Sequence, residues 1–320
     1  MNQNRAIGAM FGLAIGDAMG MPVEFLPRDK FESVTEFRAG GPFKLEAGQW
    51  TDDTAMSLCI ASSLIACNGF DAAHQMKQYS RWIDDGYLSC TGKAVGIGQT
   101  ILKAMIRYHK TKDPIQGDTN PRRSGNGCIM RLAPVPVYYS HDAALAIHHS
   151  VQSATTTHGS EMCLQTTGFF GGMIWGALNG ASKEELLSDN YSPVKDYYQQ
   201  HALCGHLLSL TRGGYKAKQE GEVDSTGFVI DALEAALWSF YNTDTYAEGL
   251  LKAVNLGGDA DTVGAIYGQL AGAYYGFEAI PADWVQGLAW NEKISAICNE
   301  LIKKCGQCHH KKLDLIINYK

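Results

Sequence analysis

The sequence predicts an all-α protein that folds as one compact domain. Over most of the chain, apolar residues recur at the three-to-four-residue spacing of amphipathic helices, and few runs show the alternation or the β-branched richness of strands. The chain has 320 residues, of which 45% are hydrophobic and 19% charged, enough for a large buried core. No segment has the composition of a linker. We therefore expect a single multi-helix domain at residues 1–304, followed by a tail at 305–320.

Helical periodicity defines the expected elements, and glycine-rich or polar runs separate them. In chain order, the expected helices are residues 4–20, 54–67, 71–84, 93–109, 142–153, 160–179, 195–211, 226–241, 245–255, 262–276 and 292–304. The expected long loops are residues 28–50, 111–128 and 211–225.

The first expected helix, residues 4–20, has some features of a signal peptide, with one early arginine and several apolar residues. However, Asp17 interrupts the apolar run, and no small-residue cleavage site follows it. We interpret the segment as a buried helix. No continuous apolar stretch has the roughly 20 residues needed to span a bilayer, so the sequence predicts no contact with a membrane.

Glycines recur every fourth residue in three of these helices. A glycine inside a helix costs about 0.5–1 kcal/mol relative to alanine, so a whole stripe of them needs compensation. Close approach of packed helix backbones supplies it, because residues four apart share one helix face. The stripes are Gly8, Gly12, Gly16 and Gly20; Gly168, Gly172, Gly176 and Gly180; and Gly264, Gly268, Gly272 and Gly276.

Charge and cysteine content narrow the class of function. The formal net charge is −6 and no basic stripe appears, which argues against nucleic-acid binding. A small phosphate-bearing substrate is still compatible with this charge, because bound cations reverse the local sign. The nine cysteines are an odd number, scattered through helical segments, which fits reduced thiols in a cytoplasmic protein.

Two short acidic clusters carry the main chemical signal. One is Gly48–Thr54 (GQWTDDT) and the other is Gly257–Thr262 (GGDADT), and each runs into a helical segment. Helix capping explains either cluster alone, because Asp and Thr favour helix starts. Adjacent residues on a helix do not face one another, however, so Asp52 and Asp53 together exceed what a cap requires. Oxygen-only ligand sets of this kind suit Mg²⁺ or Mn²⁺, and metal binding is the preferred interpretation.

Other candidates are weaker on their own. Glu24 lies just after the first glycine helix, where a lone glutamate is usually solvated, and His158 follows a threonine run, where a histidine is usually a cap or a core residue. The glycine-rich turn at 124–131 offers backbone N–H groups to an anion, without the spacing of a P-loop. The tail has an isolated metal- or haem-type pattern that we treat as incidental, formed by Cys305, Cys308, His309 and His310.

Taken together, five segments resemble the ADP-ribosylglycohydrolase family, and most closely its bacterial dinitrogenase reductase-activating type. They occur in family order between about residue 5 and residue 290 and read GAMFGLAIGDAMGMPVEF, GQWTDDTAM, GNGCIMRLAPV, THGSE and GGDADTVGAIYGQLAGAYYG. The resemblance implies an all-α fold with a dinuclear Mg²⁺ or Mn²⁺ centre in a cleft. It also implies hydrolysis of the N-glycosidic bond that links ADP-ribose to a protein side chain, most often arginine.

The resemblance also assigns residues to roles. Asp52 or Glu24 would act as the general base. The implied metal ligands are Thr51, Asp52, Asp53, Asp259, Asp261 and Thr262. The implied substrate-binding residues are Gly125, Asn126, Gly127 and Met130 in the loop for the diphosphate and distal ribose, His158 near the metals, and Phe228 as a stacking aromatic.

One departure from the family concerns Gly96, which occupies a position where relatives of the nitrogenase-regulating type carry an Asp. Asp84 or Asp85 is a possible substitute from nearby in the sequence. Two alternatives to arginine-linked hydrolysis stay open. One is an ADP-ribose-binding or immunity protein that blocks a cognate ADP-ribosyltransferase, with the N-terminal segment or the 28–50 loop as the contact. The other is hydrolysis of an O-linked ADP-ribose, on serine or on O-acetyl-ADP-ribose.

Overall fold

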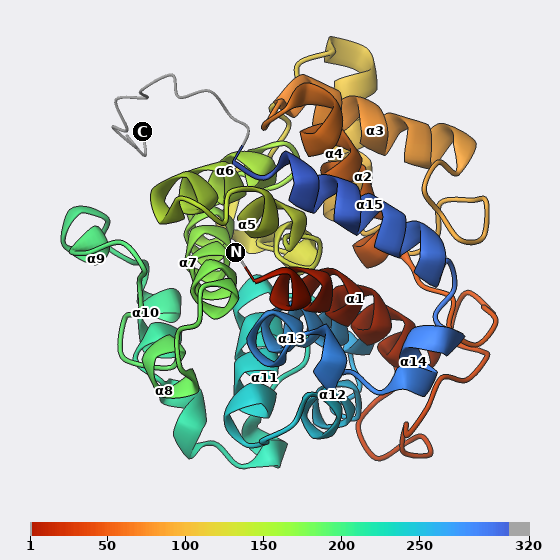
Figure 1. Cartoon of the computed structure of the whole chain (residues 1–320), viewed down its shortest axis with the longest axis vertical. Coiled ribbons are helices and arrows are strands. Elements are labelled where there is room, and N and C mark those ends of the chain that lie inside the picture. Colours follow the sequence, from red (N-terminus) through yellow and green to blue (C-terminus); the bar gives the residue numbers. More distant parts are fainter. Residues whose placement is uncertain (1, 307–320) are drawn as a thin grey trace.

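The structure, a computed structural model, describes residues 2–306 and confirms the all-α prediction (Figure 1). Within these residues there are isolated β-bridges but no strand. The α-helices are α1 (Gln3–Gly20), α2 (Asp52–Cys67), α3 (Ala72–Asp85), α4 (Gln99–Thr111), α5 (Pro134–Tyr138), α6 (Ala143–Thr155), α7 (Glu161–Leu178), α8 (Lys183–Leu186), α9 (Tyr197–Gln200), α10 (Gly205–Thr211), α11 (Val229–Tyr241), α12 (Tyr246–Val254), α13 (Ala260–Tyr275), α14 (Ala282–Gly287) and α15 (Asn291–Lys304). Short 3₁₀ turns are η1 (Met21–Val23), η2 (Pro121–Arg123), η3 (Asn126–Cys128), η4 (Gly214–Ala217), η5 (Glu220–Glu222) and η6 (Phe277–Ala279).

Two of the expected helices are wrong in extent. The helix expected at 93–109 begins only at Gln99, because Gly96 has a φ of +86°, outside the helical region. The segment expected as one helix at 195–211 forms two short helices, α9 and α10. The sequence also did not predict α5, α8 and α14, whose four to six residues are too short for a periodic pattern.

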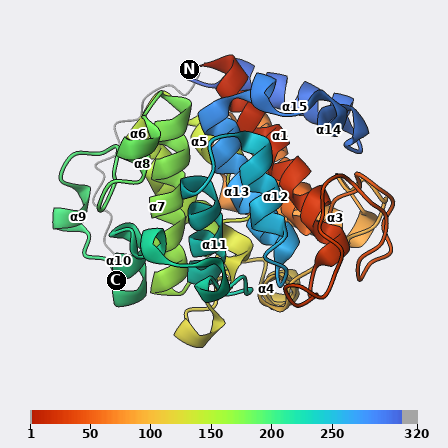
Figure 2. The same cartoon turned by 90° about the horizontal axis from the view of Figure 1, so that it is seen from below.

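Helices α1 and α13 lie side by side through the middle of the molecule (Figures 1 and 2). Helices α2 and α15 cover one side of this pair, and α7, α11 and α12 contact α13 from the other. The first and third glycine stripes face each other in antiparallel order. A Cβ added to Gly8, Gly12 or Gly16 would lie 2.0–2.2 Å from a carbonyl oxygen of Gly272, Gly268 or Gly264, respectively. The prediction of close backbone approach is confirmed for these two helices.

The middle stripe, in α7, makes contacts of a different kind. A Cβ on Gly168 would meet the Val151 side chain at 3.1 Å, and one on Gly176 would meet the Tyr191 hydroxyl at 1.9 Å. Gly180 lies beyond the helix with a φ of +92°. The prediction of a backbone-to-backbone contact is therefore wrong for this stripe, which makes room for side chains instead.

By length and composition alone, residues 3–23 would suffice to cross a membrane, with a mean hydropathy of 1.4. This corrects the expectation that no segment of the chain reaches that length. In the structure, 94% of the window is buried inside the protein, as expected of a helix at the centre of a core.

The contact between α1 and α13 should not tolerate an added methyl group. In Gly268→Ala the new Cβ would lie 1.9 Å from the Gly12 carbonyl oxygen, so the helices must separate. We expect a loss of about 3 kcal/mol in the free energy of unfolding, which exceeds the gain of about 1 kcal/mol in helix propensity. Urea denaturation measures it, with Gly205→Ala as control because nothing lies within 4 Å of a Cβ there. Equal midpoints for wild type and Gly268→Ala would contradict this packing.

Candidate metal centre and substrate cleft

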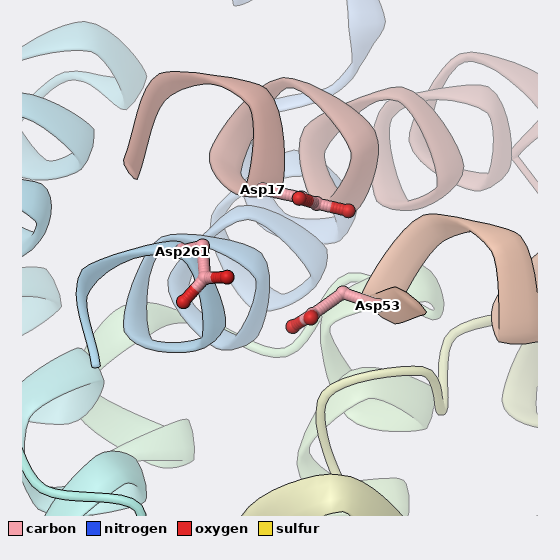
Figure 3. A group of neighbouring side chains, drawn as sticks. All are labelled: Asp17, Asp53 and Asp261. Atoms are coloured by element: carbon pink, nitrogen blue, oxygen red, sulfur yellow. The ribbon is translucent and has the colours of Figure 1, made fainter. Parts of the chain in front are cut away.

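The two acidic clusters meet at the N-terminal ends of α2 and α13. Asp52 and Asp53 form the first turn of α2, while Asp259 is the N-cap of α13 and Asp261 lies in its first turn. Figure 3 shows Asp53 and Asp261 directed toward a common space, with Asp17 of α1 beside them. One oxygen from each of these three carboxylates lies within 4.8 Å of the others. A second group of the same kind joins Glu24, Asp259 and Asp261, so Asp261 belongs to both.

Helix capping does not account for this arrangement. The N-cap residues of α2 and α13, Thr51 and Asp259, make no side-chain hydrogen bond to their own helix ends. Asp53 and Asp261 instead point into the space between the helices (Figure 3). Helix capping, the alternative that the sequence left open, is thereby excluded as the role of the Thr51 and Asp259 side chains.

The residues present fit divalent cations. The donor set consists of carboxylate and hydroxyl oxygens, which hard cations prefer. Oδ1 of Asp53 and Oε2 of Glu24 are buried and have no hydrogen-bond partner within the described residues. A buried carboxylate oxygen without a partner is costly, and a cation would supply the missing interaction.

In the metal-free protein, burial raises the pKa of every carboxylate in the cluster, and neighbouring carboxylates raise four of them further. Burial, followed by the charges of Asp259 and Asp52, raises the pKa of Glu24 to about 8. Burial is also the leading cause for Asp52, Asp53 and Asp261, whose pKa values lie well above their usual range, and neighbouring carboxylates add to it. The carboxylates therefore need compensating positive charge to be ionised together.

Asp17 is the main residue that the sequence analysis missed. It is fully buried, and its carboxylate accepts four hydrogen bonds, from the backbone N–H and the hydroxyl of Thr51 and of Thr54. The donor–acceptor distances are 2.6–2.9 Å. It thus caps α2 from a different helix. Because the Thr51 hydroxyl donates its proton to Asp17, the lone pairs of this oxygen are free to face a cation. The only signal in the sequence was a charged residue in an otherwise apolar helix.

Replacing Asp17 with Asn should weaken both the helix cap and the metal centre. A single amide oxygen cannot accept all the hydrogen bonds that two carboxylate oxygens accept, and the amide N–H₂ would face other donors. We expect a loss of about 1–3 kcal/mol in stability and about tenfold weaker Mn²⁺ binding. Thermal denaturation and isothermal calorimetry measure these, with Thr54→Ser as the control that keeps the hydroxyl. Wild-type Mn²⁺ affinity in Asp17→Asn would show that Asp17 does not position the centre.

A cavity of about 220 Å³ opens over the carboxylates. Most of the predicted site residues line it, namely Glu24, Asp52, Gly125, Asn126, Gly127, Met130, His158, Asp259, Asp261 and Thr262. Thr51 and Asp53 are absent from this lining, although both are buried next to Asp17. The remaining wall includes Gly96, which the sequence analysis singled out as a departure from the family. The sequence did not predict its other members, Phe25, Gly98, Gln99, Thr100, Ile101 and Gly227.

A second cavity, of about 340 Å³, adjoins the first and shares Gln99, Thr100, Gly125 and Gly227 with it. Phe228, predicted as a stacking residue, lines this second cavity. Its wall also holds three basic side chains that the sequence analysis did not single out, Lys103, Arg122 and Arg123. Arg123 is paired with Asp118 at 2.5 Å. The pair of cavities thus has an acidic end and a basic end.

The glycine-rich loop around Asn126 is tied to the acidic end. The Asn126 side-chain amide donates to Asp259, and its backbone N–H donates to the carbonyl of Gly227. Gly127 has no room for a side chain, because a Cβ would lie 2.9 Å from the His158 ring. The loop therefore brings its backbone close to both His158 and the carboxylates.

His158 is buried and neutral. Burial, followed by the positive charge of Arg131, lowers its pKa to about 3. The Thr157 hydroxyl accepts a hydrogen bond from Arg131 and lies 2.8 Å from Nδ1 of His158, to which it can donate its own proton. The proton of the neutral ring then lies on Nε2, which faces the loop at Gly125 and Gly127. His158 can donate a hydrogen bond into the cavity.

Gly96 lies against the acidic cluster. A Cβ at this position would be 2.3 Å from Oδ1 of Asp52, so any side chain here would point at that carboxylate. Asp84 and Asp85 are exposed and absent from the cavity lining, so neither takes the place of a carboxylate at position 96. In the tail, Cys305 contacts Ser140 at 3.0 Å and lies 4.0 Å from His141, whereas Cys308, His309 and His310 lie outside the described residues.

Comparison with known proteins gives a consistent result. The model of the ADP-ribosylglycohydrolase family matches residues 1–310. Over 304 residues the chain is 37% identical to the ADP-ribosylarginine hydrolase Tri1 of Pseudomonas putida (strain GB-1), covering 95% of this chain and 79% of that protein. Over 294 residues it is 30% identical to the ADP-ribosyl-dinitrogen reductase glycohydrolase of Rhodospirillum rubrum, covering 89% of this chain and 90% of that protein.

A solved structure, described as an ADP-ribosylglycohydrolase-related protein complex, matches this fold with a TM-score of 0.83 and 40% sequence identity. The match covers 95% of this chain and 98% of the other. With a family match along nearly the whole chain and a shared fold at this identity, the chain belongs to the ADP-ribosylglycohydrolase family.

Proposed function

We propose that the protein is a metal-dependent hydrolase that removes ADP-ribose from modified arginine side chains of proteins. The observation that carries the proposal is the meeting of the two acidic clusters under one cavity, with buried carboxylate oxygens that lack partners. The similarity to Tri1, which is named an ADP-ribosylarginine hydrolase, supports arginine as the acceptor.

Two Mg²⁺ or Mn²⁺ ions are the proposed cofactors. Their ligands would come from Thr51, Asp52, Asp53, Asp259, Asp261 and Thr262. Of these, Asp53, Asp259 and Asp261 belong to the two carboxylate groups, and the other three are their neighbours in the sequence. When bound, such ions supply positive charge that polarises ribose hydroxyls and lowers the pKa of water. Elemental analysis of the purified protein tests both the identity and the number of the ions.

The chain's own residues would orient the substrate and move a proton. Lys103 and Arg122 at the basic end suit the diphosphate of the ADP group, and Nε2–H of His158 suits an oxygen in the acidic end. Glu24 is our choice as general base, because it lines the cavity and one of its buried carboxylate oxygens has no partner among the described residues. It would take a proton from the attacking water while the bond between the anomeric carbon and the guanidine nitrogen breaks through an oxocarbenium-like state. The guanidine would leave with the bonding electron pair and then accept a proton from solvent to become the arginine cation.

The decisive experiment uses peptides of one sequence, ADP-ribosylated on either arginine or serine. Mass spectrometry follows each peptide with the protein, with and without Mg²⁺ or Mn²⁺. Metal-dependent loss of the modification from the arginine peptide alone supports the proposal. Loss from the serine peptide alone would assign the O-linked alternative instead, and no loss from either would overturn the activity.

A cognate ADP-ribosyltransferase is a further proposed partner, as the source of the modified protein. Co-expression of such a transferase with the Asp261→Asn variant separates two roles. If the variant no longer protects the cell from the transferase, the wild type acts by hydrolysis. If the variant still protects the cell, the protein acts by blocking the transferase.

The proposed location is the cytoplasm, supported by eight free cysteines among the described residues.

A further inference from the structure

Phe25 has an unusual position at the rim of the acidic cavity. It follows Glu24 directly and lines the same cavity as Glu24 and Asp261. The residue is 65% exposed, more than any other of the exposed large hydrophobic residues in the described chain. An aromatic ring left this open gains little from packing in the core. Core packing therefore does not explain why the residue is a phenylalanine.

The backbone at Phe25 is also unfavourable for such a residue. Its φ of +65° lies in the left-handed region, which costs most side chains roughly 1–2 kcal/mol. Two hydrogen bonds hold it there, from Phe25 N–H to the Gly258 carbonyl at 2.6 Å and from Gly258 N–H to the Leu26 carbonyl at 2.9 Å. These bonds join the turn after Glu24 to the loop that carries Asp259. Strained residues of this kind concentrate at sites of function.

The two cavities set the direction of the substrate. Phe25 lines the acidic cavity and is absent from the basic one, which holds Lys103, Arg122 and Arg123. With the ADP group at the basic end and the proximal ribose over the carboxylates, the group attached to the anomeric carbon extends away from the basic end. Glu24, the neighbour of Phe25 in the sequence, likewise lines the acidic cavity and not the basic one.

We infer that the ring of Phe25 receives the guanidinium group of the modified arginine and thereby favours arginine-linked over alcohol-linked ADP-ribose. The inference rests on the proposed function and adds a specificity residue to it. A guanidinium is planar and cationic, and it stacks well on aromatic faces. Charge favours the same ligand, because two divalent cations supply four positive charges to a cluster of six carboxylates, which include Asp17 and Glu24. A serine-linked substrate has no cation to place against the ring.

Phe25→Leu tests the inference, because leucine keeps an apolar side chain but removes the aromatic face. We expect the KM for an arginine-ADP-ribosylated peptide to rise about five- to tenfold with little change in kcat. Inhibition by free ADP-ribose, which has no guanidinium, should be unchanged. Phe25→Tyr should retain the wild-type KM. Leu26→Ala is the matched control, since Leu26 is also exposed but lies outside the cavity lining.

A second variant separates this role from a structural one. Phe25→Gly relieves the left-handed backbone, so its melting temperature should not fall, while its KM should rise as in Phe25→Leu. An unchanged KM in Phe25→Leu would overturn the inference. A parallel rise in KM and in the inhibition constant of ADP-ribose would also overturn it, since the ring would then contact ADP-ribose itself. Failure of wild type to act on the arginine peptide would instead refute the proposed function, before any variant is compared.

Discussion

Asp261→Asn is expected to abolish metal-dependent release of ADP-ribose while making the metal-free protein more stable. Asp261 is the one carboxylate that belongs to both acidic groups, so its loss affects both proposed ion positions. Removing a partner of a metal ligand already costs 10–100-fold in affinity or activity, so removing a shared ligand should cost at least about a hundredfold. The amide keeps the shape of the side chain and its carbonyl oxygen for the Thr262 N–H, which lies 2.7 Å from Oδ1.

The gain in stability distinguishes this prediction from simple misfolding. Burial and the charges of Glu24 and Asp259 hold the pKa of Asp261 well above its usual range, so its ionised form is unfavourable without cations. A neutral amide removes that repulsion. Calorimetry in EDTA should therefore show a higher melting temperature for Asp261→Asn than for wild type, and Mn²⁺ titration should show weaker binding.

Asp283→Asn is the matched control, because Asp283 also lies in the first turn of a helix, α14, but is exposed and remote from the cavity lining. It should keep wild-type activity and Mn²⁺ binding. Turnover close to wild type in Asp261→Asn, at any metal concentration, would rule out the proposed centre.

The sequence indicated the chemistry better than the geometry. The two acidic clusters were visible because each concentrates carboxylates within a few residues, and helix periodicity placed both at helix starts. Asp17 was not visible as part of them, because its role depends on contacts with Thr51 and Thr54 that are formed only in the tertiary structure. Helix pattern alone does not distinguish such a residue from an interruption of an apolar run.

The glycine spacing predicted part of the helix packing correctly. It predicted close helix contacts, and the pairing of Gly12 with Gly268 bears this out, but the same spacing in α7 accommodates side chains such as Tyr191. A glycine stripe shows which face of a helix lacks side chains. It does not show whether the backbone of another helix or a side chain packs against that face. The start of α4 was predicted wrongly for a local reason, since the positive φ at Gly96 is outside the helical region and Gly96 lines the acidic cavity instead.

Without divalent cations, the protein is expected to become more stable as the pH falls from about 8 to about 5. Glu24 and Asp17 have pKa values of about 8 and about 6 in the folded protein, above their values of 4.5 and 3.8 in the unfolded chain. Between the unfolded and folded pKa values the native state binds more protons than the unfolded state, so stability falls as the pH rises through that window. One pKa unit corresponds to about 1.4 kcal/mol, so the cluster as a whole contributes a few kcal/mol.

Mg²⁺ should reverse this dependence. The ions bind ionised carboxylates and compete with protons, so their stabilising effect grows as the pH rises. Thermal denaturation across this pH range, in EDTA and in excess MgCl₂, measures both trends. We expect a melting temperature at least about 5 °C higher at the acidic end in EDTA and the opposite order in MgCl₂. A melting temperature that does not depend on pH in EDTA would mean that the carboxylates are not mutually destabilised, and the main physical argument for a metal centre between α2 and α13 would be lost.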